Sequence, residues 1–252
     1  MTTRIFLATL REYMDVRLTV IGSSPAWPNP GGAQSGYLLE GPGRLLLDCG
    51  PGVLARLRER GPLAVEAIAI THFHLDHWGD LVPWAWLCAY GPDGELRPEV
   101  WVPPGGRGEL EGFASRWGND GMFERAFDLH EFAPGREFDA AGFAVTPLRV
   151  PHYRLDAYGF RVRDPGGAVL AYSGDSGPGE ELADLARAAG LFLCEATLAQ
   201  GEDADPRGHL TAHEALAAAD GPVLLTHRPV ELAAPDGARV ATDALVLEVD
   251  PR

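Results

Sequence analysis

The stretch that decides the fold is THFHLDH at residues 71–77, because four residues of metal-binding type fall within it. These four are His72, His74, Asp76 and His77. They follow AIAIT at 67–71, an apolar run typical of a buried strand. In an extended turn, alternating side chains can direct the first two histidines to one cation, while the aspartate and the third histidine turn toward a second. One histidine alone is usually structural, but this cluster predicts a metal site.

Three more polar residues stand where apolar runs end. His152 follows PLRVP, Asp175 ends AYSGD, and His227 follows VLLT. Each position puts a polar side chain at the rim of a predicted sheet. Each would be weak evidence alone, but with the first four they make seven ligands. Seven ligands and a water are enough for two zinc-like ions of roughly four or five ligands each.

The remaining apolar runs indicate a strand-rich chain with interspersed helices. We expect strands at 17–22, 36–40, 44–48, 67–71, 99–102, 143–150, 158–163, 168–173, 191–194, 223–226 and 239–248, and helices at 52–60, 79–90, 106–118, 179–189 and 211–219. Thr211 and Glu214 form a capping-box pair at the start of the last helix. This order fits two sheets packed face to face with helices outside.

The ligand pattern resembles the metallo-β-lactamase superfamily. The resemblance rests on HxHxDH at 72–77, the isolated His152, SGD at Asp175 and the late His227, and it spans residues 16 to 248. It implies an α/β fold, the four-layer αββα sandwich. It assigns His72, His74 and His152 to one metal and Asp76, His77 and His227 to the other, with Asp175 bridging. Asp48 in LLLDCGPG matches the superfamily's DxG motif and is implied to brace the metal loop.

Such a site implies a hydrolase with two divalent metal ions. Two cations about 3.5–4 Å apart convert water into a strong nucleophile at neutral pH and stabilise charge on the substrate oxygen. We expect zinc, with manganese and iron as alternatives, because His/Asp sites of this type accept all three.

Two further motifs favour phosphorus chemistry. EAT at 195–197 and GHLT at 208–211 resemble the motif pair of tRNase Z-like (ribonuclease Z-like) phosphodiesterases, in which a glutamate and a histidine form an acid/base couple. Expulsion of an alkoxide from phosphorus needs a proton or positive charge on the leaving oxygen. The candidate catalytic residues are therefore Asp76, Glu195 and His209. We interpret His213, inside the following helix, and His130 as ordinary exposed histidines.

The chain departs from the tRNA-processing members. Their clamping arm lies, in most of them, between the motif histidine and the motif aspartate, and only 22 residues (153–174) separate His152 from Asp175 here. The loop 22–36, GSSPAWPNPGGAQSG, holds no basic residue. The resemblance is closer to a compact, armless group that carries GSxxAWPxPGxAxSGYL. Trp27 in this loop and Trp78 after the ligand cluster could stack on a base, although core packing is the more common fate of tryptophan.

Composition bounds the partners and the compartment. The formal charge is −15, from 36 acidic and 21 basic residues, and the basic residues are all arginine. The absence of lysine excludes Schiff-base chemistry, and the acidity disfavours a grip on a long nucleic acid. Three scattered cysteines and an apolar run, IFLATL, that is too short to span a membrane fit a cytoplasmic protein without membrane attachment.

The sequence therefore predicts a phosphodiesterase for a small diester, either a cyclic nucleotide or a short oligonucleotide. Two alternatives stay open. One is a lactonase or other carbon-ester hydrolase, for which Glu195 and His209 would be incidental. The other is a tRNA 3'-end processing endoribonuclease that gains its RNA grip from a homodimer partner. For domain organisation, we expect an extension at 1–15, either a disordered terminus or an upstream misassigned start, before one domain at 16–252.

Overall fold

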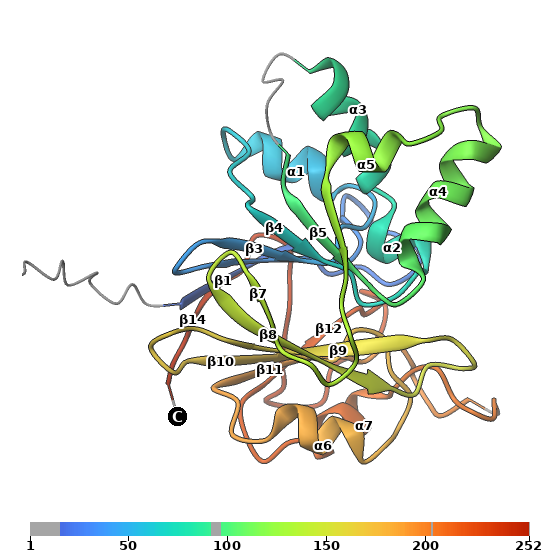
Figure 1. The fold of residues 1–252 in the computed structure, drawn as a ribbon. Coiled ribbons are helices and arrows are strands. Elements are labelled where there is room, and N and C mark those ends of the chain that lie inside the picture. The colour runs from blue at the N-terminus through green and yellow to red at the C-terminus, as the bar shows by residue number, and fades with distance from the viewer. Residues whose placement is uncertain (1–15, 92–96, 203, 252) are drawn as a thin grey trace, which may run out of the picture.

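The computed structural model describes residues 16–91, 97–202 and 204–251, which form two seven-stranded sheets (Figure 1). The first sheet has the order β14 (Val246–Val249), β1 (Val16–Gly22), β2 (Gly36–Glu40), β3 (Arg44–Leu47), β4 (Ala67–Ala69), β5 (Glu99–Val102), β6 (Asp128–Glu131). The second has the order β13 (Arg239–Val240), β12 (Val223–Thr226), β11 (Leu191–Glu195), β10 (Val169–Tyr172), β9 (Ala157–Arg163), β8 (Phe143–Val150), β7 (Phe138–Ala140). The predicted extension at 1–15 lies outside the described residues.

Helices cover the outer face of each sheet (Figure 1). The first sheet carries α1 (Val53–Glu59), α2 (Leu75–Trp78), α3 (Leu81–Tyr90), α4 (Gly106–Arg116) and α5 (Met122–Ala126), and the second carries α6 (Glu181–Ala186) and α7 (Ala212–Ala217). Three apolar clusters separate these layers. One, with Leu39 and Phe160, lies between the sheets, and the others lie under the two helical layers. The predicted four-layer αββα sandwich is confirmed.

Parallel strands carry the polar residues to one edge. β3, β4, β5 and β6 run parallel in the first sheet, and β10, β11, β12 and β13 do so in the second. β8 is antiparallel to β9, which is antiparallel to β10, so β8 has the same direction as β10. The carboxyl ends of these strands meet at a common edge, as expected for a site built from connecting loops.

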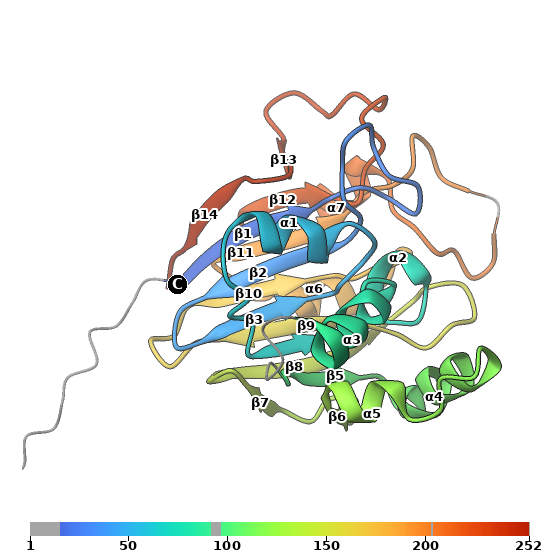
Figure 2. The same ribbon diagram turned by 90° about the horizontal axis from the view of Figure 1, so that it is seen from above.

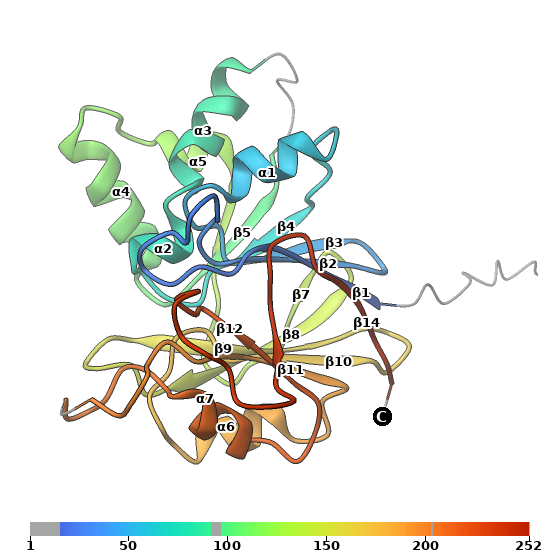
Figure 3. The ribbon, with the colours of Figure 1, turned by 180° about the vertical axis from the view of Figure 1, so that it is seen from behind.

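The predicted elements differ from the structure in three places. The expected strand at 239–248 is two strands in different sheets, because β13 pairs with β12 and β14 pairs with β1. Figure 3 shows β14 beside β1, away from β12. Asp243 holds this crossing by accepting hydrogen bonds from the Ser23 hydroxyl and the Ala33 amide. The expected helix at 79–90 begins as α2 at Leu75 and restarts as α3 at Leu81. The segment 122–140 holds α5, β6 and β7, none of which the sequence patterns indicated.

The capping box that opens α7 is present, since the Thr211 side chain accepts from the Glu214 amide and the Glu214 carboxylate accepts from the Thr211 amide. No helix in the described part of the chain is both long and apolar enough to cross a membrane.

Candidate active site

The seven predicted ligands converge at one end of the sandwich. The turn after β4 carries four of them, and the loops after β8, β10 and β12 carry His152, Asp175 and His227. Figure 2 shows these connections gathered around α2 at the same end of the two sheets. Six of the seven side chains are buried, and His74 is partly exposed. Residues up to 155 positions apart thus form a single, mostly buried polar cluster.

The first ligand group consists of His72, His74, His152 and Asp175. One ligand atom from each lies within 4.8 Å of the others. Nδ1 of His74 lies 3.0 Å from Nε2 of His152. The Asp175 Oδ2 atom is 3.9 Å from Nε2 of His72 and 4.0 Å from Nε2 of His152. These separations match the edges of a tetrahedron of nitrogen and oxygen around one ion.

The second ligand group consists of Asp76, His77, His227 and again Asp175. Nε2 of His77 lies 3.5 Å from Asp76 Oδ2 and 3.2 Å from Asp175 Oδ1. Nε2 of His227 lies 3.1 Å and 3.5 Å from the same two carboxylate atoms. Asp175 offers Oδ2 to the first group and Oδ1 to the second, so it is placed to bridge them.

Hydrogen bonds from the far side of each ring fix which nitrogen faces the cluster. Nδ1 of His77 donates to Asp48 Oδ2 at 2.7 Å, and Nδ1 of His152 donates to the Gly208 carbonyl oxygen at 2.6 Å. The Thr71 hydroxyl donates to Asp48, so it accepts from Nδ1 of His72 at 3.0 Å. Such outer partners set the tautomer and leave the Nε2 lone pair free for a metal.

His227 follows the same pattern in the second sheet. The Thr197 hydroxyl donates to the His227 carbonyl oxygen or to Glu195, so it accepts from Nδ1 of His227 at 2.8 Å. His74 is the exception, because it turns Nδ1 toward the cluster.

The donor set fits divalent cations. Four Nε2 lone pairs, one Nδ1 lone pair and two carboxylates face one another, an arrangement that is repulsive unless positive charge lies between them. Among the described residues, the buried His72 Nε2, His77 Nε2 and Asp175 Oδ1 atoms have no hydrogen-bond partner. Unpaired buried polar atoms are costly, and an ion at each group would satisfy them. Imidazole and carboxylate ligands suit zinc, manganese and iron.

The pKa shifts reflect the same electrostatics. Burial and the neighbouring His77 hold the pKa of His72 well below its ordinary value, so its ring is neutral. Burial opposes the charged form of His77, but the carboxylates of Asp175 and Asp48 raise its pKa. The acidic side chains thus create a negative potential at the position that a cation would occupy.

Asp48 braces the ligand turn, as the resemblance implied. Its carboxylate is fully buried and accepts from the Thr71 amide at 2.8 Å and from the Tyr172 hydroxyl at 2.7 Å, in addition to His77. Asp48 has a positive φ of 57°, a conformation that only a few per cent of non-glycine residues adopt. The strained backbone and the hydrogen bonds from three residues give Asp48 a structural role beside the ligands.

Glu195 and His209 form a third group together with Asp175. Nδ1 of His209 donates to Glu195 Oε1 at 2.8 Å and lies 3.9 Å from Asp175 Oδ2. Glu195 is fully buried and also accepts from the backbone amides of Ser176, Thr197 and Leu210. Burial opposes the charged form of His209, but the Glu195 hydrogen bond and charge raise its pKa to about 9. The sequence-predicted pair is therefore in contact, directly beside the bridging carboxylate.

Two further histidines and two tryptophans that the sequence analysis named differ in how deeply they are buried. His213 is exposed on α7, while His130 is partly buried and stacks on Trp101 at a centroid distance of 4.5 Å. Trp78 is buried and packs edge-on against Phe73, Phe113 and Phe123. Trp27 is 55% exposed, so of the two tryptophans only this one can meet a substrate in solution.

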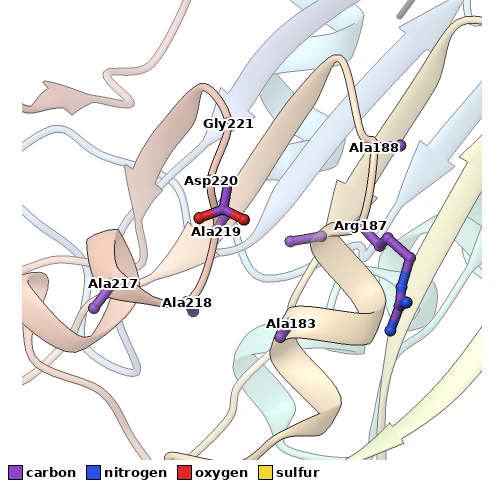
Figure 4. Close-up of a pocket in the computed structure, with 9 residues that line it drawn as sticks. Ala183, Arg187, Ala188, Ala217, Ala218, Ala219, Asp220 and Gly221 are labelled. Atoms are coloured by element: carbon purple, nitrogen blue, oxygen red, sulfur yellow. The ribbon is translucent and has the colours of Figure 1, made fainter.

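Sequence reasoning missed four residues that surround the site. Thr71 and Thr197 hold ligand histidines, and Tyr153 and Glu202 contact the loop that carries His209. The threonines could have been found from their position next to the ligand and EAT motifs. A separate hollow of about 370 Å³ lies between α6 and α7, is lined mainly by alanines and contains none of the predicted site residues (Figure 4).

Comparison with known proteins places this geometry in a family context. Residues 43–222 match the family described as beta-lactamase superfamily domain. Uncharacterized protein ML1173 of Mycobacterium leprae is 34% identical over 232 residues, which cover 85% of this chain and 78% of that protein. Ribonuclease Z of Mycobacterium marinum is 30% identical over 196 residues, which cover 71% of this chain and 69% of that protein. The crystal structure of the metallo-β-lactamase-fold protein YhfI from Bacillus subtilis superposes with a TM-score of 0.79 at 24% identity, covering 93% of this chain and all of YhfI.

Proposed function

This chain belongs to the β-lactamase superfamily as a metallo-hydrolase, and on that premise we propose that it is a dinuclear-metal phosphodiesterase for small diesters. The substrate class is a cyclic nucleotide or a short oligonucleotide. His72, His74 and His152 would hold one ion, Asp76, His77 and His227 the other, and Asp175 both. Zinc is the proposed metal, with manganese and iron as alternatives.

The observation that carries the proposal is the contact between Glu195 and His209 beside the bridging aspartate. Glu195 Oε1 accepts from Nδ1 of His209 at 2.8 Å, which leaves Nε2 to face the substrate. Among the described residues no protein group hydrogen-bonds to this Nε2 atom, and 15% of the side chain is exposed. A buried carboxylate that orients a reachable imidazole is the arrangement that acid/base catalysis needs.

In this proposal His209 protonates the leaving group. When bound, the two cations would supply Lewis acidity and activate the attacking water. As the bond between phosphorus and the leaving oxygen breaks, Nε2 of His209 gives its proton to that oxygen, and Glu195 stabilises the imidazolium before this transfer. Water restores the proton to Nε2 after product leaves. Ring opening of a lactone has less need of such a donor, so the pair favours a diester over a carbon ester.

Trp27 supports a substrate with a base or aryl group. It stands on the loop 22–36, which is anchored to the loop after His227 by two hydrogen bonds of Asn29, to the Arg228 carbonyl oxygen at 2.9 Å and from the Val230 amide at 3.0 Å. A half-exposed indole held beside a ligand loop is suited to stacking on a base.

The likeness to ribonuclease Z of Mycobacterium marinum favours tRNA 3'-end processing as a second candidate. Two observations weigh against it. The segment between His152 and Asp175 is filled by the antiparallel β9–β10 hairpin, which leaves no chain for a clamping arm there. The formal charge of −15 and the loop without basic residues give little attraction for a long polyanion.

The test compares substrates and variants on one metal-loaded preparation. We expect hydrolysis of a chromogenic phosphodiester to exceed hydrolysis of a lactone and a thioester. His209→Ala should lower diesterase turnover by about 100-fold or more, because a general acid contributes at least that factor. His213→Ala, which removes an exposed histidine four residues away, is the matched control and should stay within about twofold of wild type.

Two results would contradict the proposal. If His209→Ala retains turnover within about threefold of wild type, the acid/base role is wrong. If lactone is the preferred substrate, the carbon-ester alternative replaces the diesterase. Cleavage of a precursor tRNA that weakens steeply with salt would instead support tRNA processing.

A further inference from the structure

The carboxylate of Glu202 holds the backbone of the segment that carries His209. Its Oε1 atom accepts from the Gly208 amide at 2.8 Å and from the His209 amide at 3.3 Å. Its Oε2 atom accepts from the Tyr153 hydroxyl at 3.1 Å. Charge-assisted hydrogen bonds to neighbouring amides fix a backbone more strongly than neutral ones. One side chain therefore joins residues 208 and 209 to the loop after β8.

Tyr153 completes this contact from the other side. Its aromatic ring lies so close to Gly208 that a Cβ atom at that position would collide with it. The ring centroid is 5.7 Å from that of His209, edge to face. Tyr153 also has a positive φ of 48°, which is uncommon for an aromatic residue and requires support from its surroundings. Gly208 is thus enclosed between the Tyr153 ring and the Glu202 carboxylate.

Residues 208 and 209 contact both a predicted metal ligand and the proposed acid/base pair. The Gly208 carbonyl oxygen accepts from Nδ1 of the ligand His152 at 2.6 Å. The next residue, His209, is the proposed acid and contacts Glu195. A shift of the 208–209 backbone would misplace a metal ligand and the proton donor together, and displacements of about 1 Å cost on the order of 100-fold in rate.

We propose that Glu202 is a positioning residue, which acts with Tyr153 as a latch that sets the place of His209 and the orientation of His152. The catalytic part of this inference rests on the proposed function of His209. The structural part, that the latch orders residues 208 and 209, does not depend on the reaction.

Hydrogen–deuterium exchange tests the structural part without any substrate. In Glu202→Ala, the peptide that covers residues 204–212 should exchange at least about tenfold faster, because two amides lose their acceptor. A peptide from β11 should be unchanged. Glu59→Ala, which removes an exposed carboxylate on α1, is the control and should leave both peptides at wild-type rates. Wild-type exchange of 204–212 in Glu202→Ala would overturn the latch.

A double-mutant cycle tests the catalytic part. Glu202→Ala should lower kcat by about tenfold with KM within about twofold, since it displaces an outer partner rather than a binding group. In the His209→Ala background the same change should lower kcat by less, about threefold or less, because only its effect through His152 remains. Tyr153→Phe keeps the aromatic ring and should lower kcat only a few-fold.

The outcomes separate this inference from the proposed function. Equal losses from Glu202→Ala in both backgrounds would show that it does not act through His209. Rapid exchange in Glu202→Ala together with full activity of His209→Ala would refute the proposed acid but leave the latch standing. Glu202→Gln retains one acceptor oxygen and should restore slow exchange, which separates a lost hydrogen bond from misfolding.

Discussion

The two sheets build their halves of the predicted ligand cluster in different ways. At the edge of the first sheet, four ligands lie within six consecutive positions, and the next residue, Trp78, is buried among Phe73, Phe113 and Phe123. At the edge of the second sheet, each ligand stands on its own loop. The loop to His209 is held by carboxylates, namely Glu202 on its backbone and Glu214 on Arg207.

The difference separates two kinds of rigidity. Apolar packing beneath α2 holds the first edge, together with one fully buried carboxylate, that of Asp48. Hydrogen bonds to carboxylates fix the second edge, so it responds to pH and to single polar substitutions. The four contiguous ligands thus lie on the apolar-packed edge, and the proposed acid lies on the edge that is held by hydrogen bonds to carboxylates.

The largest effect should come from removing the apolar anchor. Trp78→Ala leaves a large cavity under the ligand turn and should lower the free energy of unfolding by about 3–5 kcal/mol. Trp27→Ala removes an indole that is 55% exposed and should change it by less than about 0.5 kcal/mol. Urea titrations of the two variants measure both values. Similar losses for both would refute the contrast between a packed and a free tryptophan.

The next largest effect concerns zinc affinity, and it depends on the hydrogen-bond partners of two predicted ligand histidines. Asp48→Asn removes a charged acceptor from His77, and zinc affinity should fall by about 10–100-fold. Thr197→Val removes a neutral acceptor from His227, and the loss should be smaller, about tenfold or less. Competition with a chromogenic chelator measures each affinity. A larger loss in Thr197→Val would mean that the second edge, not the first, determines metal binding.

The contrast between contiguous ligands at one edge and dispersed ligands at the other explains how much of the site the sequence could predict. The cluster at 72–77 is contiguous, so its chemistry was visible in the residues themselves. His152, Asp175 and His227 were weak signals one by one and gained meaning only together with the cluster at 72–77. Their convergence depends on β8, β10 and β12 ending at one edge, an arrangement that no local pattern specifies. The structure brings all seven together, while their roles remain predictions.

The misses have physical causes as well. The run 239–248 is rich in strand-forming residues, but it crosses from one sheet to the other near Asp243, whose carboxylate accepts from Ser23 and Ala33. Helix α5 has too few residues for a periodic signal, and β6 holds a single apolar residue, Leu129. Glu202 could not be singled out, because its partners at Tyr153 and Gly208 become neighbours only after the second sheet has formed.

The smallest expected effect concerns the charge that holds the second edge. Glu214 pairs with Arg207 at 2.7 Å, and Arg207 also donates to the His209 carbonyl oxygen at 3.2 Å. The Arg207 hydrogen bond lowers the pKa of Glu214 from an ordinary value of 4.5 to about 2. Glu214→Gln keeps a capping-box residue at this position but removes the charge. Because the pair is partly exposed, the loss of stability at pH 7 should be less than about 1 kcal/mol.

The pH dependence of this loss follows from the direction of the shift. A carboxylate whose pKa is lower in the folded protein stabilises it fully above the unfolded value, and the stabilisation disappears as pH falls through the folded value. The difference in the free energy of unfolding between wild type and Glu214→Gln should therefore be constant from pH 7 to about 6 and become smaller below pH 5. At about pH 3 it should have fallen by more than half. Urea unfolding across this range measures the difference, with Glu59→Gln as the control. A difference that does not change with pH would mean that the amide alters helix capping, and that charge does not hold this edge.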